Sequence, residues 1–212
     1  MRILITAGGT REYIDPVRFI SNASSGRMGI ELARAAFNAG HKVTLIATVP
    51  CGLQLRNKAR IIQVENASEM FEAVKKHFVN CDCLIMSAAV ADYTPVKKSK
   101  VKIKKQNNNL TIKFKTTRDI LKWAGMNKNI KRKNKNRMVV GFALEDDNLL
   151  ENAERKLKEK KLDMIIANDI SAIGNKKSSV YIKIKNLPWL EFVELSKKIT
   201  SRRIIKLIGD LT

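Results

Sequence analysis

Short apolar runs and longer amphipathic segments alternate along most of the chain, a pattern that predicts strands and helices in succession. Residues 2–7 (RILITA) form the first apolar run, which is typical of a buried strand. Residues 26–39 carry apolar side chains at helical spacing, with Ser24 and Ser25 available as caps and Gly40 as a stop. By the same criteria, we predict further strands at 42–48, 60–64, 83–88, 137–143, 162–169 and 180–185, and further helices at 68–79, 118–125, 148–161 and 196–209.

Strands that alternate with helices of this length indicate βαβ units. We therefore predict an α/β fold, with a Rossmann-like, doubly wound, mostly parallel sheet and right-handed connections. One segment departs from the pattern, because residues 100–105 (KVKIKK) and 110–115 (LTIKFK) place Lys on one face and Val or Ile on the other. This alternation predicts a half-exposed, basic β-ribbon flap inserted at about 97–116. No linker or internal repeat is evident, so we expect a single domain over residues 1–212.

The composition narrows the class of protein. Hydrophobic residue types make up 44% of the 212 residues, which excludes general disorder and a small disulfide-stapled fold. No apolar run approaches the roughly 18 residues of a membrane span, and the N-terminus lacks a secretory cleavage pattern. Three cysteines cannot all pair with one another, which fits a reducing compartment. We expect a cytoplasmic protein without a membrane partner.

The net charge of +21 is concentrated in one segment. Residues 97–137 hold 16 Lys and Arg and a single acid, Asp119. Such a block attracts polyanions, so a basic nucleic-acid-binding module is an alternative function. Single-strand binders interleave aromatic residues for base stacking, however, and this segment contains only Phe114 and Trp123. We therefore expect no nucleic-acid partner, and residues 127–137 fit a solvated surface.

Two stretches rich in Gly and Ser fall where a doubly wound sheet binds ligands. Ala7-Gly8-Gly9-Thr10 follows the first strand, and residues 21–26 (SNASSG) precede the first long helix. Strand ends and helix N-termini at this edge offer free N–H groups to anions, which favours a phosphate site. A dinucleotide dehydrogenase fits poorly, because the glycines lack the G-x-G-x-x-G spacing and the second strand ends without an acid for the ribose.

Several longer motifs occur in one order along the chain. They are ITAGGTREYIDPVRFISNASSGRMG (5–29), SAAVADYTP (87–95), KVKIKK (100–105) and GFALE (141–145), followed by a lysine-bearing helix at 152–161 and by LDMIIAND (162–169). Together they resemble the phosphopantothenate–cysteine ligase family in its bacterial form, from Ile3 to about residue 185. Bacterial members are often fused behind a flavin-dependent decarboxylase domain, so the resemblance implies a stand-alone ligase or an excised ligase domain.

The resemblance implies a two-step reaction in coenzyme A biosynthesis. The carboxylate of 4′-phosphopantothenate attacks CTP, giving an acyl-cytidylate and pyrophosphate, and the amine of L-cysteine then displaces CMP. It also implies CTP rather than ATP, a homodimer, and Mg²⁺ or Mn²⁺ as the divalent cation. No acidic cluster is evident in the sequence, so we expect the cation to arrive with the nucleotide.

The resemblance also assigns residues to roles. It gives catalytic roles to Asn22, the asparagine of SN-x-SSG that handles the acyl intermediate, and to Lys102 of KIKK. The expected substrate-binding residues are Arg18, Asn22, Ser24, Ser25 and Gly26. With Gly8 and Gly9 from the phosphate argument, the expected nucleotide-binding residues are Gly8, Gly9, Met86, Ser87, Ala88, Asp92, Lys102, Asp119, Ile120, Leu121, Lys122, Phe142, Lys156 and Lys160.

Taken singly, these residues have ordinary structural explanations. Asp92 could cap a helix, Phe142 could belong to the core, and Lys156 and Lys160 could be solvated, although their spacing places them on one helical face. Arg27 replaces the Lys that is common in the family's SSGKMG motif, which keeps the charge but changes its geometry. Only the joint pattern therefore favours the ligase.

Overall fold

The computed structural model describes residues 1–52, 55, 57–105, 109–130, 137–169, 175 and 177–211. Its main sheet has eight strands. They are β1 (Arg2–Ala7), β4 (Lys42–Ala47), β5 (Arg60–Gln63), β6 (Cys83–Met86), β9 (Met138–Glu145), β10 (Met164–Asp169), β11 (Lys177–Ile184) and β12 (Trp189–Ser196).

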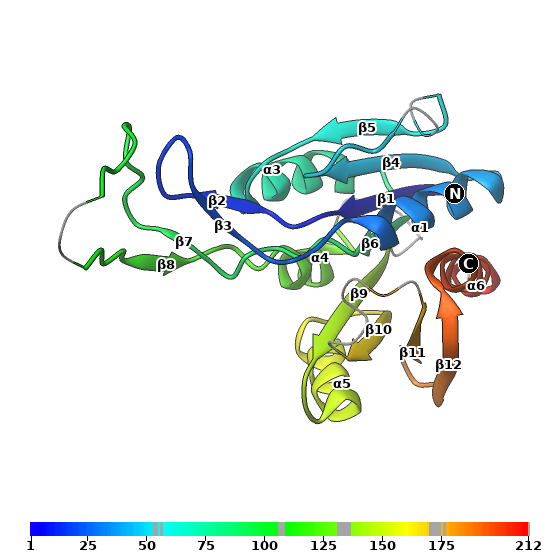
Figure 1. Ribbon diagram of the computed structural model, residues 1–212. Helices are drawn as coiled ribbons and strands as arrows, with labels where there is room; N and C mark the ends of the chain where they lie inside the picture. The colour runs from blue at the N-terminus through cyan, green and yellow to red at the C-terminus, as the bar shows by residue number, and fades with distance from the viewer. Residues whose placement is uncertain are drawn as a thin grey trace.

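The strand order identifies the topology. Across the sheet it runs β12-β11-β10-β9-β6-β1-β4-β5 (Figure 1), and the neighbours from β10 to β5 pair in parallel. Six parallel strands in this arrangement are typical of a doubly wound dinucleotide-type sheet, whose order reverses between β1 and β6. The strands β11 and β12 extend it antiparallel. The predicted Rossmann-like, mostly parallel α/β fold is confirmed.

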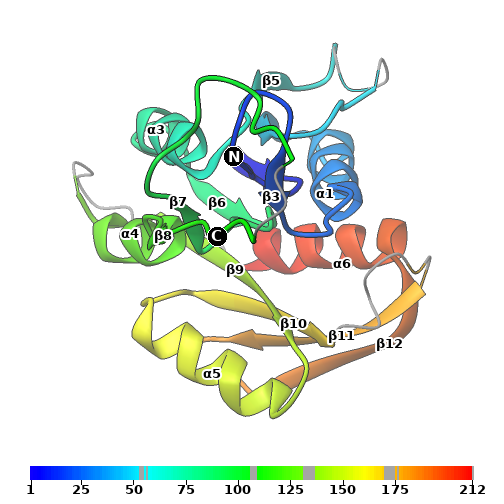
Figure 2. The ribbon, with the colours of Figure 1, turned by 60° about the vertical axis from the view of Figure 1, so that its left-hand side comes forward.

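Five helices of the described chain cover the two faces of this sheet. Their bounds are α1 (Arg27–Asn38), α3 (Ala67–Phe78), α4 (Ile120–Asn127), α5 (Leu149–Glu159) and α6 (Lys197–Asp210). Leu32 of α1 and Ile204 of α6 share one core cluster with Ile5 of the sheet, whereas Met70 of α3 and Leu157 of α5 share the other. Figure 2 shows α1 and α6 side by side, and none of the described helices is long and apolar enough to cross a membrane.

The helix starts differ in how their N–H groups are satisfied. Side chains of Asn66, Asp119 and Ser196 cap α3, α4 and α6 by accepting a backbone N–H three residues ahead. In contrast, α1 begins after Gly26 without a side-chain cap, so the expected capping by Ser24 or Ser25 is wrong. The first N–H groups of α1 therefore remain available to a ligand.

Two small antiparallel pairs form an arm that projects from the sheet (Figure 1). One pairs β2 (Arg11–Tyr13) with β3 (Phe19–Ser21), and the other pairs β7 (Tyr93–Pro95) with β8 (Phe114–Thr116). We define the arm as residues 11–21 and 93–116, as far as the structure describes them.

The predicted pairing of residues 100–105 with 110–115 is wrong. Within residues 100–105 and 110–115, only Phe114 and Lys115 belong to a strand. That strand is β8, and it pairs with β7 instead of with residues 100–105. The reason lies in competing hydrogen bonds: Ile103 N–H donates to the Asp15 carboxylate, and Ser99 N–H donates to the carbonyl oxygen of Ile14. This part of the flap is therefore attached to the turn between β2 and β3.

Candidate active site

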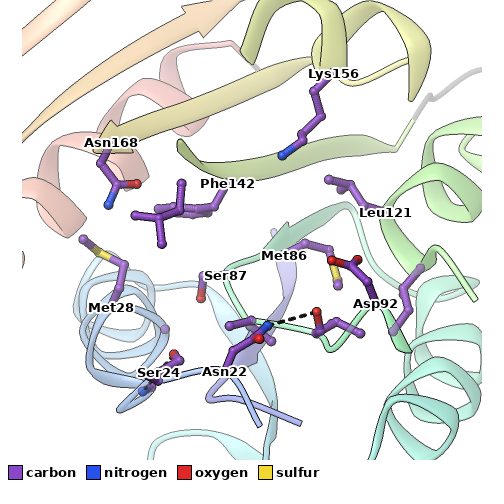
Figure 3. Close-up of a pocket in the computed structure, with 18 of the residues that line it drawn as sticks. Asn22, Ser24, Met28, Met86, Ser87, Asp92, Leu121, Phe142, Lys156 and Asn168 are labelled. Atoms are coloured by element: carbon purple, nitrogen blue, oxygen red, sulfur yellow. Dashed lines mark hydrogen bonds between the residues drawn. The ribbon is translucent and has the colours of Figure 1, made fainter. Parts of the chain in front are cut away.

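A cavity of about 750 Å³ lies at the carboxyl-terminal edge of the sheet, beside the ends of β6, β9 and β10. The starts of α1, α4 and α6 complete its walls. It is close to the reversal of strand order between β1 and β6, where doubly wound sheets bind ligands, and its volume suits a nucleotide-sized molecule. Figure 3 shows side chains from these elements converging on it, so we take it as the candidate active site.

One wall is the loop of residues 22–26, and glycines beneath it allow the close approach of backbones. Gly26 has a φ of 71° and Gly8 a φ of 91°, both in the left-handed region. A Cβ on Gly26 would lie 3.2 Å from the nitrogen of Gly8, and a Cβ on Gly9 would lie 2.6 Å from the carbonyl oxygen of Asn22. Gly8 and Gly9 therefore support the loop from below and do not line the cavity.

Asn22 lines the cavity and has a fixed orientation. Its Nδ2 donates a hydrogen bond to the carbonyl oxygen of Val90 at 3.2 Å, the dashed line in Figure 3. An amide nitrogen carries two hydrogens, so this bond holds the side chain while a second N–H stays free to donate. Ser24, Ser25 and Gly26 line the same wall, as expected.

The segment after β6 forms the next part of the wall and is tied to β1. Ser87 Oγ donates to the carbonyl oxygen of Thr6 at 2.6 Å, and Ala88 N–H donates to Thr6 Oγ1 at 3.1 Å. The Ser87 proton is thus used inside the protein, and its oxygen can only accept from a ligand. Asp92 also lines the cavity and makes no ion pair within the described chain.

Two lysines, Lys156 in α5 and Lys160 directly after it, line the cavity, and each forms an ion pair with a carboxylate. Lys156 Nζ lies 3.1 Å from Glu145 Oε1, and Lys160 Nζ lies 2.8 Å from Asp119 Oδ2. Burial raises the pKa of Asp119, but the hydrogen bonds from Lys160 and from the backbone N–H of Lys122 outweigh it and hold that pKa below its usual value. This side of the cavity is therefore close to neutral.

Apolar side chains form a wall between these charged groups. In Figure 3, Met86 lies near the centre of the cavity, Leu121 to the right and Phe142 to the left, toward Asn168; Ile120 also lines the cavity. A flat aromatic ligand gains from contact with such a surface, and nearby polar groups can fix its orientation. This part of the cavity suits a nucleobase.

Besides Gly8 and Gly9, three more of the expected site residues lie outside the cavity. Arg18 and Lys102 belong to the arm, and Lys122 does not line the wall, although its backbone N–H takes part in the cap of α4. The Arg18 guanidinium is 2.6 Å from a carboxylate oxygen of Asp15 and also donates to the carbonyl oxygen of Ile103. Arg18 therefore joins the two halves of the arm within this chain.

Several cavity residues were absent from the expected site, and four of them have polar or charged side chains that come from widely separated elements. These four are Arg27, Asn168, Ser178 and Lys197. Asn168 is the second-last residue of β10 and of the LDMIIAND motif, and its place after a buried apolar run was a usable signal. Lys197 lies beyond the stretch of family resemblance, so its role depended on where α6 packs.

No cluster of three or more His, Cys, Asp or Glu side chains that could hold a metal ion occurs in the described ranges. The cavity carboxylates there are Asp92 and Asp119, and Asp119 is paired with Lys160. A Mg²⁺ ion needs only one or two carboxylates when phosphates supply further ligands. The donor set fits a cation that is bound mainly by a nucleotide, with Asp92 as the protein group.

The chain is similar to proteins of coenzyme A metabolism. It matches the family model of the DNA/pantothenate metabolism flavoprotein C-terminal domain over residues 1–211. The coenzyme A biosynthesis bifunctional protein CoaBC of Borreliella burgdorferi is 41% identical over 204 residues, which cover 93% of this chain and 51% of that protein. A protein from an unspecified prokaryote, named cysteine/cysteine sulfinic acid decarboxylase, is 46% identical over 173 residues, covering 82% of this chain and 47% of that protein. The chain thus spans about half the length of these curated relatives.

A solved structure agrees with the sequence matches. The crystal structure of the C-terminal domain of CoaBC superposes with a TM-score of 0.81 at 38% identity, over 99% of this chain and 94% of that chain. The family resemblance drawn from the motifs is thereby confirmed. The chain belongs to the family of the DNA/pantothenate metabolism flavoprotein C-terminal domain.

Proposed function

We propose that this chain is a ligase that joins 4′-phosphopantothenate to L-cysteine in coenzyme A biosynthesis, with CTP as the nucleotide. The observation that carries the proposal is the cavity, which collects Asn22, Ser87, Asp92, Phe142 and Lys156 from motifs far apart in the sequence. The names of the CoaBC relatives, from Borreliella burgdorferi and Bacillus subtilis, support the pathway.

In the first step, a carboxylate oxygen of phosphopantothenate attacks the α-phosphorus of CTP. The bond from that phosphorus to the oxygen that bridges the α- and β-phosphates breaks, and pyrophosphate leaves with the electron pair. Negative charge grows on the leaving group, so fixed N–H donors and cations lower the barrier. The uncapped start of α1, at Arg27, offers such N–H groups at the cavity wall.

In the second step, the cysteine amine attacks the acyl carbon of the acyl-cytidylate. The bond between that carbon and the phosphate oxygen breaks, CMP leaves with the electron pair, and the amine proton passes to solvent. The second N–H of Asn22 can donate to the acyl oxygen as charge develops there. A neutral amide does this without adding a charge that repels the phosphates.

The divalent cation enters with the nucleotide in this proposal. Asp92 is the protein group that would contact it, since this carboxylate has no ion-pair partner in the described ranges. When bound, Mg²⁺ neutralises phosphate charge. Phe142 and Leu121 supply the apolar surface for the cytosine, with Lys156 and Lys160 beside it.

The proposal includes a homodimer formed through the arm. Large apolar side chains are exposed along it, namely Val17, Phe19, Ile20, Tyr93, Val96, Val101, Leu110 and Phe114. Exposed apolar patches and uncovered strand edges are typical of interaction surfaces. Lys102 lies on the arm and does not line the cavity of its own chain. In the proposed dimer, the arm of one copy brings Lys102 to the nucleotide bound in the cavity of the other copy.

A coupled assay tests the ligase proposal. The protein is incubated with CTP, Mg²⁺, 4′-phosphopantothenate and L-cysteine, and pyrophosphate is measured together with the amide product by mass spectrometry. Pyrophosphate should appear only when phosphopantothenate is present. If pyrophosphate is released with ATP but not with CTP, the nucleotide in the proposal changes to ATP. If none is released with either nucleotide, in the presence of Mg²⁺ or of Mn²⁺, the proposal is overturned.

The nucleic-acid alternative has less support. Of the two aromatic residues in the basic segment 97–137, Trp123 packs edge-on against Phe71 and Phe78, with ring centroids 5.4 Å apart in both pairs. Its ring is therefore partly buried against the core, and this packing competes with stacking on bases. Salt-dependent RNA or DNA binding tighter than CTP binding would revive this alternative.

A further inference from the structure

Two strands change from apolar to polar side chains where they reach the cavity. On the face of the sheet that α1 and α6 cover, β10 carries the buried Ile166 and then Asn168 at the cavity. On the same face, β11 carries the buried Ile182 and Val180 and then Ser178. Alternate residues of a strand point to one face, so Asn168 and Ser178 continue two apolar rows with polar side chains.

These two side chains make no hydrogen bond with any group in the described part of the chain. Ser178 is nevertheless buried, with 9% of its surface exposed. The neighbouring Ser179 differs, because its Oγ accepts the backbone N–H of Glu194 at 3.1 Å. A buried hydroxyl without a partner costs free energy, so the unused groups at Asn168 and Ser178 indicate a ligand that bonds to them.

Asn168 lies across the cavity from part of the surface that suits a nucleobase. In Figure 3, Asn168 is on the same side of the cavity as Met28, and Leu121 and Asp92 are on the other side. Asn22, whose free N–H is proposed to contact the acyl oxygen, lies between the two sides in this view. A molecule held at Asn168 would therefore approach the acyl carbon from the side away from Leu121.

The chemistry of the two side chains suits an attacking amine. A neutral primary amine has two N–H groups to donate and one lone pair that must point at the acyl carbon. The amide oxygen of Asn168 and the hydroxyl oxygen of Ser178 each accept a hydrogen bond, and they come from paired strands. Together they can hold both N–H groups and so direct the lone pair.

The lack of charge on Asn168 and Ser178 also matters. A carboxylate at either position would favour the ammonium form of the ligand, which has no lone pair and cannot attack. Neutral acceptors bind the amine without this effect. Met28, on the same side of the cavity, adds a polarisable thioether surface for a short side chain such as that of cysteine.

We propose that Asn168 and Ser178 bind the amine of L-cysteine and orient it for attack on the acyl-cytidylate. The assignment rests on the proposed function, because it concerns the second substrate of that reaction. The two side chains then contribute to the second step and not to the release of pyrophosphate in the first.

The dependence of each step on L-cysteine tests the assignment. Amide formation is measured by mass spectrometry over a range of cysteine concentrations for the wild type, Asn168→Ala and Ser178→Ala. We expect kcat/KM for cysteine to fall roughly three- to tenfold in each variant, as for the loss of one hydrogen bond between neutral groups. Pyrophosphate release in the absence of cysteine, which reports the first step, should match the wild type.

The matched control is Ser179→Ala. Ser179 is the next residue of β11 and does not line the cavity, so this variant should keep the wild-type kcat/KM for cysteine. Thermal unfolding of all three variants, together with their first-step activity, shows whether each one is folded.

The outcomes separate this assignment from the proposed function. Unchanged kcat/KM for cysteine in Asn168→Ala and Ser178→Ala would overturn the assignment alone. A loss of pyrophosphate release as large as the loss of amide formation would also overturn it, because the side chains would then serve the first step. If the wild type releases no pyrophosphate with CTP or ATP, the proposed function itself fails.

Discussion

Asn22 is held by one hydrogen bond to Val90 and keeps a second N–H for a ligand. The change Asn22→Asp replaces this donor with a negative charge, so the acyl oxygen loses its partner in the second step. We expect amide formation to fall roughly 100-fold, as for loss of an oxyanion donor, while pyrophosphate is still released and the acyl-cytidylate accumulates. Quenched reactions analysed by mass spectrometry measure the intermediate and product separately.

The control for this change is Asn80→Asp, because Asn80 is exposed and does not line the cavity. It makes the same chemical change and should leave both steps unaffected. Wild-type rates of product formation in Asn22→Asp would show that the amide has no part in handling the intermediate.

Most candidate residues next to a strand end could be predicted from the sequence. Ser87 and Asp92 follow the buried strand β6, and Phe142 lies in the second half of β9. The parallel sheet brings these parts of the strands to one edge, so the motifs and the topology agree. Lys197 could not be found in this way. It reaches the cavity because α6 returns alongside α1 after an antiparallel hairpin, and no local pattern specifies that packing.

At the scale of elements, the contact between α1 and β1 depends on Gly29. A Cβ at this position would lie 2.6 Å from Ala7 Cβ and 2.7 Å from Ser87 Oγ. The change Gly29→Ala should therefore push α1 away from the sheet and lower the free energy of unfolding by about 1–3 kcal/mol. Chemical denaturation measures the loss, and the cavity wall should shift with the helix.

The control for Gly29→Ala is the same change at Gly209. Gly209 lies in α6, and a Cβ added there would have no neighbouring atom within 4 Å, so Gly209→Ala should be neutral or stabilise by up to about 1 kcal/mol through helix propensity. Equal effects of the two changes would contradict a packing role for Gly29.

The arm depends on Asp15, a buried carboxylate. It accepts hydrogen bonds from the N–H groups of Val17, Arg18 and Ile103 and from the Arg18 guanidinium. Burial raises the pKa of Asp15, but these donors outweigh it and hold the pKa well below its usual value. Because the pKa of Asp15 is lower in the folded state than in the unfolded state, the ionised carboxylate stabilises the fold at pH values above about 3.9, the ordinary pKa of an Asp side chain. This stabilisation is lost as the pH falls below that value toward the pKa of the folded state.

The change Asp15→Asn should therefore lower the Tm by several degrees at pH 7, and the difference from the wild type should narrow below about pH 4. Thermal unfolding followed by circular dichroism at both pH values tests this. Asp146→Asn, at an exposed position, is the control and should change little at either pH. A Tm difference that is independent of pH would contradict the role assigned to the ionised carboxylate.

The arm also shows where prediction from the sequence failed. Alternating Lys and Val or Ile at 100–105 satisfies the pattern of a strand, but a pattern does not identify the partner of its N–H groups. The backbone there donates to Asp15, and only three-residue strands pair in the described part of this region. The parallel strands were predicted well because each is a buried apolar run whose neighbours follow from βαβ connections.

At the scale of the whole molecule, one prediction concerns two copies of the chain. Lys102 lies outside the cavity of its own chain, on an arm with an exposed apolar surface. We expect Lys102→Gln to weaken pyrophosphate release because the first step loses a cation. Sedimentation at micromolar concentration should show a dimer, and a monomer alone would contradict the proposed assembly.

Mixing two defective variants tests whether Lys102 acts across the dimer. If each site combines Asn22 of one copy with Lys102 of the other, a heterodimer of Asn22→Asp and Lys102→Gln contains one intact site. Random reassortment makes half of the dimers heterodimers, so product formation should recover to roughly one quarter of the wild-type value. If Lys102 instead serves its own chain, every site in the mixture carries one defect, and activity stays at the average of the two variants.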